Sequence, residues 1–132
     1  FSGNNSPVTG HGVTFINTGN GGTYPFTELK LDGNVSLDFS APLTGTYAGM
    51  LFYQDPLNAL PSTIVGNAGA VLAGNLYFPS SALTLKGNSG TDIPIGTVVA
   101  QKVSVMGNTK FIMTNAYGGT GGTGTQRIGL YE

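Results

Sequence analysis

Residues 103–111 read VSVMGNTKF, and residues 83–90 read LTLKGNSG. In both stretches apolar residues alternate with polar ones until the alternation stops at a Gly-Asn pair. The pair recurs upstream in LKLDGNVSLDF, from Leu29, and in TIVGNAGAVL, from Thr63. Alternation with a period of two predicts β-strands, and no window shows the 3.6-residue period of a helix. The chain is therefore predicted to be all-β.

A second type of segment stands between the Gly-Asn pairs. It opens with glycine and continues with apolar residues, as in GVTFIN from Gly12, GMLFYQ from Gly49, GNLYFPS from Gly74 and GTVVAQ from Gly96. The two types alternate strictly, so a two-segment unit recurs about every 20–25 residues, which is typical of a solenoid. We therefore predict a single-domain parallel β-solenoid (β-helix) of about four coils.

The Gly-Asn pairs have a ready interpretation in such a fold. Equivalent positions of successive coils stack about 4.8 Å apart, so asparagine amides can hydrogen-bond along the axis. Glycine supplies a backbone bend that other residues adopt poorly. We interpret the pairs as a structural ladder at the coil corners, formed by Gly33, Gly66, Gly87 and Gly107 with Asn34, Asn67, Asn88 and Asn108.

An antiparallel β-sandwich is the alternative fold. A Gly-Asn pair between alternating arms is also typical of a two-residue β-hairpin. LKLDGNVSLDF and VSVMGNTKFIMT both fit that pattern. However, the residues that follow Gly87 make a weak strand, and a meander gives no reason for the second segment type. The solenoid is therefore the leading prediction.

The two ends differ from the middle of the chain. Residues 1–11 are polar and are expected to form an arm or cap, and residues 12–114 the solenoid domain. Residues 115–132 are expected to form a Gly-rich loop and a terminal strand, RIGLYE. The end coils of a solenoid expose unpaired backbone groups, which must be capped or used for association. Head-to-tail association without ring closure produces a filament.

The composition excludes several classes of partner. Charged residues make up 8% of the 132 residues, against a usual ~25%, and the formal net charge is −1. There is no basic face for nucleic acid and no apolar run long enough to form a membrane helix. The sequence has no cysteine, which excludes disulfides and thiolate metal sites.

No catalytic motif accompanies the titratable residues. The single histidine, His11, has no partner motif such as HExxH or GxSxG. A polysaccharide-active enzyme needs two carboxyls about 5–10 Å apart in a cleft. The positions equivalent to Asp32 in later units are Val65, Lys86 and Met106, so no acidic stripe forms. We expect no enzyme, no metal and no cofactor, and we interpret His11 and the aspartates as solvated: Asp32, Asp38, Asp55 and Asp92.

Four aromatic residues form a possible binding face: Phe52, Tyr53, Tyr77 and Phe78. Aligning GMLFYQ with GNLYFPS at their first glycines places Phe52 beside Tyr77, and Tyr53 beside Phe78. Because successive residues of a strand point to opposite faces, one pair should face the core and the other outwards. An exposed aromatic pair can bind carbohydrate or contact a partner, and the competing interpretation divides these rings between the core and neighbouring loops.

Four stretches resemble the C-terminal region of TadG-like proteins, which are associated with Tad (Flp-type) pilus assembly in bacteria. They are GVTFINTGN, LDGNVSLDFSAPLTGTYAGMLFYQDP, GNAGAVLAGNLYFPSSALTLKGNSG and VVAQKVSVMGN, and the most specific parts are Ser40–Asp55 and Leu72–Gly90. The resemblance covers residues 12–108. It implies an envelope or extracellular location, a structural role and no catalytic residues.

The predicted function combines these features. We expect a non-catalytic extracellular or cell-surface structural protein, associated with a bacterial pilus or self-assembling into a filament through its solenoid ends. The expected partner is a second copy of the chain, together with other pilus or envelope proteins. The alternative is a carbohydrate-binding adhesin module that uses the aromatic face.

Overall fold

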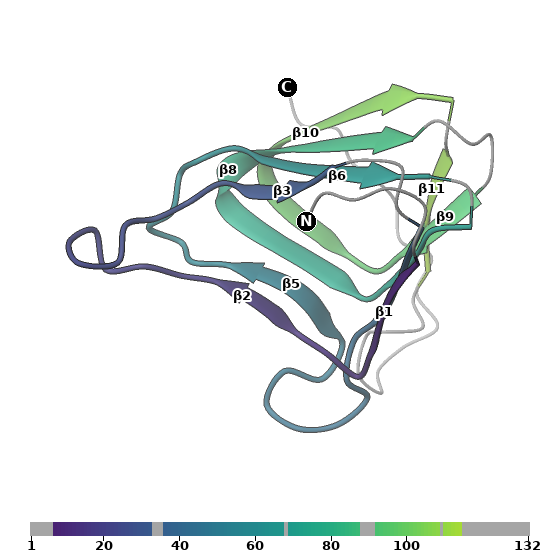
Figure 1. The fold of residues 1–132 in the computed structure, drawn as a ribbon, viewed down its shortest axis with the longest axis horizontal. Helices are drawn as coiled ribbons and strands as arrows, with labels where there is room; N and C mark the ends of the chain where they lie inside the picture. The colour runs from purple at the N-terminus through teal and green to yellow at the C-terminus, as the bar shows by residue number, and fades with distance from the viewer. Residues whose placement is uncertain (1–6, 33–35, 68, 88–91, 109, 115–132) are drawn as a thin grey trace.

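All regular elements of the computed structural model are β-strands (Figure 1). The structure describes residues 7–32, 36–67, 69–87, 92–108 and 110–114, and no helix occurs within these ranges. The strands are β1 (Val8–His11), β2 (Phe15–Asn17), β3 (Leu29–Leu31), β4 (Leu37–Ser40), β5 (Met50–Gln54), β6 (Ser62–Gly66), β7 (Val71–Ala73), β8 (Asn75–Gly87), β9 (Asp92–Ile95), β10 (Val98–Gly107) and β11 (Lys110–Met113).

The strand pairings are parallel throughout the described ranges. One sheet has the order β1-β4-β7, and β9 pairs with β11. The largest sheet has the order β2-β5-β8-β6-β3, with β10 along β8. Strand β6 ends at Gly66, and the next strand, β7, pairs with β4 instead of turning back onto β6. The hairpin interpretation of Gly-Asn, and with it the antiparallel sandwich, is therefore wrong for this part of the chain.

The largest sheet is curled because β8 is long and bends. Its first half pairs with β5 and its second half with β6, so the two halves of the sheet face each other across the interior (Figure 1). In both halves, neighbouring strands follow the order of the chain. The half formed with the start of β8 has the order β2, β5, β8, β10, and the half formed with its end has the order β3, β6, β8, β10. Parallel neighbours need a long connection between them, which the intervening strands provide here.

The core lies inside this curl, and alternation selects its residues. Leu31, Ile64 and Leu85 occupy one register position in β3, β6 and β8, and each is at most 1% exposed. Phe39 and Phe52 belong to the same core, and their ring centroids lie 6.4 Å apart. Burying each of these side chains contributes roughly 1.5–3 kcal/mol to folding.

The glycines of the Gly-Asn pairs align where they are described. Gly66 pairs with Gly87, and Gly87 pairs with Gly107. Gly107 has a φ of 92°, which favours glycine, as the expected backbone bend requires. Glycine is favoured at position 66 for a different reason, because a Cβ there would collide with Cδ1 of Ile93.

Several predicted features fall outside the described residues. These are residues 1–6 of the expected arm, the loop and terminal strand at residues 115–132, and the ladder residues Gly33, Asn34 and Asn88. The rest of the expected arm includes β1, which pairs with β4 along its whole length.

Candidate functional site

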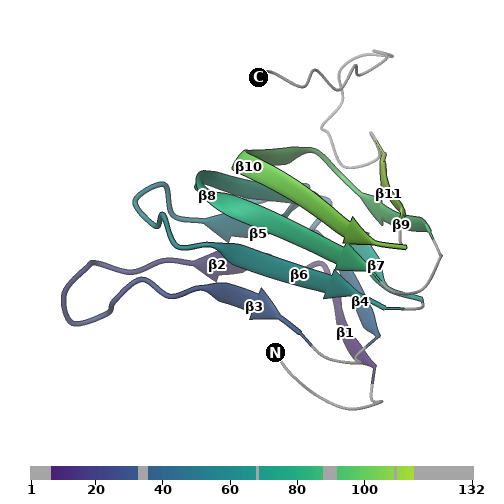
Figure 2. The same ribbon diagram turned by 90° about the horizontal axis from the view of Figure 1, so that it is seen from above.

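The sheets have two outer edges, and these form the candidate site. Strands β1, β2 and β3 lie at one edge, here called the first edge, and β10 and β11 lie at the other, the last edge (Figure 2). Within the described ranges no further strand pairs with either edge. Each edge therefore presents backbone N–H and C=O groups that can pair with another strand.

Apolar side chains that face the interior remain exposed at the last edge. Val103 pairs with Leu83 of β8, and Val105 pairs with Leu85. Both leucines are at most 1% exposed, so the two valines point into the same interior. Yet Val103 is 46% and Val105 57% exposed. The core is uncovered at this end of the described structure.

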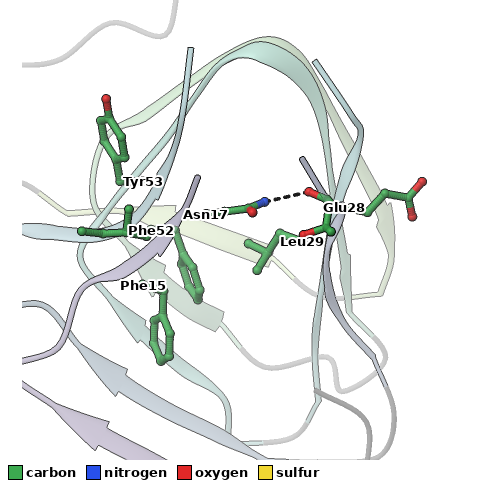
Figure 3. Close-up of a pocket in the computed structure, with 8 residues that line it drawn as sticks. Phe15, Asn17, Glu28, Leu29, Phe52 and Tyr53 are labelled. Atoms are coloured by element: carbon green, nitrogen blue, oxygen red, sulfur yellow. Dashed lines mark hydrogen bonds between the residues drawn. The ribbon is translucent and has the colours of Figure 1, made fainter. Parts of the chain in front are cut away.

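The first edge is hollowed by a pocket of about 210 Å³ (Figure 3). It is lined by Phe15, Ile16, Asn17, Thr27, Glu28, Leu29, Phe52 and Tyr53. These residues come from β2, β3, the segment before β3 and the neighbouring β5. Ligand pockets usually exceed about 300 Å³, so this one is small for a dedicated ligand site. It is better described as the open end of the core at the first edge.

A buried amide network lies beside this pocket. The Gln54 side chain is fully buried and donates to the carbonyls of Asn58 and Leu60 at 3.1 and 3.0 Å. Its Oε1 accepts hydrogen bonds from Asn17 Nδ2 at 3.1 Å and from Ser62 Oγ at 2.8 Å. The network ties the first edge to β5 and β6. Sequence reasoning missed this network because part of it lies in a stretch with the composition of a polar loop. The shared position of Asn17 and Gln54 in two Gly-initiated segments indicates that the two amides are neighbours, but not that they are buried.

The predicted alignment of the aromatic residues is wrong by one position. Tyr53 pairs with Tyr77, and Phe52 pairs with Leu76. The register shifts at Leu51, which bulges so that both Leu51 and Phe52 are buried. Phe78 is also fully buried, so Phe52 and Phe78 are core residues and are not part of an outer face.

The two tyrosines stack on the outer surface. Their ring centroids lie 5.3 Å apart with an interplanar angle of 10°. Ile16 of β2 pairs with Tyr53, and Val99 of β10 pairs with Tyr77. These two side chains are 47% and 43% exposed. A partly apolar stripe therefore crosses four strands from the first edge to the last.

The titratable residues take part in local contacts. Nε2 of His11 lies 3.2 Å from Oδ2 of Asp38, and the two side chains are 66% and 43% exposed. Asp55 accepts hydrogen bonds from the Leu57 backbone and the Thr18 hydroxyl, which fixes the turn after β5. Nζ of Lys30 lies 3.4 Å from Oδ2 of Asp32. Among the described residues, no three side chains of metal-binding type come together.

The asparagine ladder has only two members in the described structure, Asn67 and Asn108. The Asn108 amide donates to the Gly87 carbonyl at 2.9 Å, and the Asn67 carbonyl accepts from Ala70. These are backbone bonds at the ends of β10 and β6, and the side-chain ladder stays a prediction.

Comparison of the chain with protein-family models, with curated proteins and with solved structures gives no match. Within the described ranges, no helix has the length and apolar character needed to cross a bilayer.

Proposed function

We propose that the protein is a non-catalytic structural module that forms a parallel β-solenoid and assembles end to end. Parallel neighbours that follow chain order support the solenoid, because successive coils would pair in that sequence. The TadG-like resemblance supports an extracellular or cell-surface location and association with a bacterial pilus. The proposed partner is another copy of the chain, or other pilus and envelope proteins.

One observation carries the proposal of assembly. Val103 and Val105 face the interior at the last edge but are about half exposed, and the strand that holds them has a free outer edge within the described structure. A strand placed along that edge would satisfy backbone groups and bury both side chains. The first edge offers a comparable surface, with Phe15 and Leu29 at a hollow in the core. Two different edges that both accept a strand produce open, filament-like assembly.

Negative-stain electron microscopy with light scattering tests this proposal. Long uniform fibres at neutral pH are the expected result. The substitution Val105→Asp should abolish them while leaving the circular-dichroism spectrum unchanged, because it places a charge in the contact. Leu57→Asp is the matched control, since Leu57 is 80% exposed in the loop between β5 and β6 and should leave the fibres intact. Monodisperse monomers of the unmodified chain at all concentrations would contradict the proposal.

Carbohydrate binding is the second candidate, and the pocket at the first edge favours it. The lining of the pocket combines an aromatic ring, an amide and a carboxylate, from Tyr53, Asn17 and Glu28 (Figure 3). Against it, Tyr53 and Tyr77 stack on each other, so each ring covers one face that a sugar would need. A glycan array probed with the unmodified chain and with Tyr53→Ala tests this candidate. A signal that disappears in the variant would support it, and the absence of any signal would remove it.

A further inference from the structure

The two edges of the molecule share register positions. The recorded pairings place four residues in one column across the curled sheet: Leu29, Ser62, Leu83 and Val103. Extending this register by one residue before the starts of β3 and β6 gives the next column, Glu28, Pro61, Ala82 and Lys102, in which the pairing of Ala82 with Lys102 is observed. A glutamate therefore stands at the first edge, directly before β3, in the column that ends with a lysine at the last edge.

Both charged side chains lie on the outer surface. Val103 faces the interior, so the adjacent Lys102 points outwards. The carboxylate of Glu28 points away from Asn17 and from the interior (Figure 3). Both residues are exposed, and in the described ranges neither belongs to an ion pair. Their neighbours in the column, Ala82 and Pro61, are uncharged.

From this arrangement, we propose that the partner at each edge is a second copy docked in register, with Lys102 of one copy beside Glu28 of the next. Strand β10 of one copy would lie parallel to β2 and β3 of the other, about 4.8 Å away, as neighbouring strands do. The inference rests on the end-to-end assembly proposed above and specifies its register and its contacts.

The other columns fit the same docking. Val103 would meet Leu29, and Val105 would meet Leu31, so the uncovered core would continue into the next copy. On the outside, Val99 would meet Ile16 and extend the apolar stripe. Ser104 would meet Lys30, and Met106 would meet Asp32. In this register, no charged residue of β10 would lie beside a residue of the same charge in β2 or β3 of the next copy.

Charge reversal tests the register. Lys102→Glu would place two carboxylates at each contact, and Glu28→Lys would place two ammonium groups there. Each variant should raise the concentration at which half the protein is assembled about three- to tenfold at low salt, measured by sedimentation velocity. The loss should shrink in about 1 M salt, where the screening length falls to about 3 Å.

Mixing distinguishes a specific contact from a folding defect. In an equimolar mixture of the two single variants every contact between unlike chains pairs opposite charges, so assembly should return as an alternating copolymer. The double variant K102E/E28K should also assemble like the unmodified chain. Lys86→Glu is the control, because Lys86 is exposed within β8, one strand in from the last edge, and takes no part in the proposed contact but changes the net charge equally. It should assemble normally.

The failure modes are separate. If the unmodified chain assembles but both reversals behave like Lys86→Glu, or if mixing restores nothing, the docking register is overturned while end-to-end assembly stands. If the unmodified chain never assembles, the proposed function fails and this inference fails with it.

Discussion

Asn17 lies beside Gln54 in the parallel pairing of β2 with β5, and its side-chain amide donates to Gln54 Oε1 over 3.1 Å. The same amide donates to the Thr27 carbonyl at 2.9 Å. Asn58 Nδ2 also donates to that carbonyl, at 3.1 Å. The interior at the first edge is therefore held by side-chain amides and backbone carbonyls. A satisfied polar network of this kind rigidifies a core, whereas a partly satisfied one is costly.

Replacing Gln54 by leucine should lower the free energy of unfolding by about 2–4 kcal/mol. The change roughly keeps the volume but leaves the buried carbonyl of Asn58 and the part-buried carbonyl of Leu60 without their donor, and the loss at a buried group costs roughly 1–3 kcal/mol. Urea denaturation followed by circular dichroism measures the effect. Gln101→Leu makes the same chemical change at an exposed position in β10 and should stay within about 0.5 kcal/mol. Equal losses in both variants would contradict the role of the network.

The stacked tyrosines should be energetically coupled. Aromatic pairs contribute about 0.5–1.5 kcal/mol beyond the area that they bury. In a double-mutant cycle, the variant with both Tyr53→Ala and Tyr77→Ala should therefore lose less unfolding free energy than the two single variants lose together. The difference should be about 0.5–1.5 kcal/mol. Thermal and urea unfolding of the four proteins provide the measurement. Strict additivity, within about 0.3 kcal/mol, would mean that the rings do not stabilise the contact between β5 and β8.

Much of the strand arrangement could be predicted from the sequence because residue alternation and side-chain burial have the same period. The segments that open at Gly12 and Gly49, aligned at their glycines, give the observed pairs of Phe15 with Phe52 and Ile16 with Tyr53. The alignment fails one strand later, at Leu51. A bulge adds one residue to a strand without changing its apolar character, so the pattern of residue types does not reveal it.

The buried amides could not be predicted for a different reason. Gln54 and Asn58 stand in QDPLNALP, which has the composition of a surface turn. Gln54 is buried because the loop folds back over the end of β5, and there it accepts a hydrogen bond from Ser62 at the start of β6. That closure depends on contacts between distant segments, which local patterns do not encode. The uncovered valines of the last edge are likewise a property of position in the sheet, since Val103 resembles any other core residue in sequence.

The glycine of the second Gly-Asn pair is predicted to be required for packing. An added Cβ at Gly66 would collide with Cδ1 of Ile93, which is fully buried and has little room to move. Gly66→Ala should therefore lower the unfolding free energy by about 1–3 kcal/mol, as other overpacked cores do. Gly22→Ala is the control, because the nearest contact of a Cβ there is Asn20 Oδ1 at 3.7 Å.

A second substitution identifies the cause of this loss. Ile93→Val removes the colliding Cδ1 and alone should cost about 0.5–1.5 kcal/mol. If the collision with Ile93 causes the loss in Gly66→Ala, the variant with both substitutions should lose less unfolding free energy than the two single variants lose together. The difference should be at least about 0.5 kcal/mol. Urea midpoints of the four proteins give the answer. Additive losses would mean that the collision with Cδ1 of Ile93 is not the reason why Gly66→Ala is destabilising.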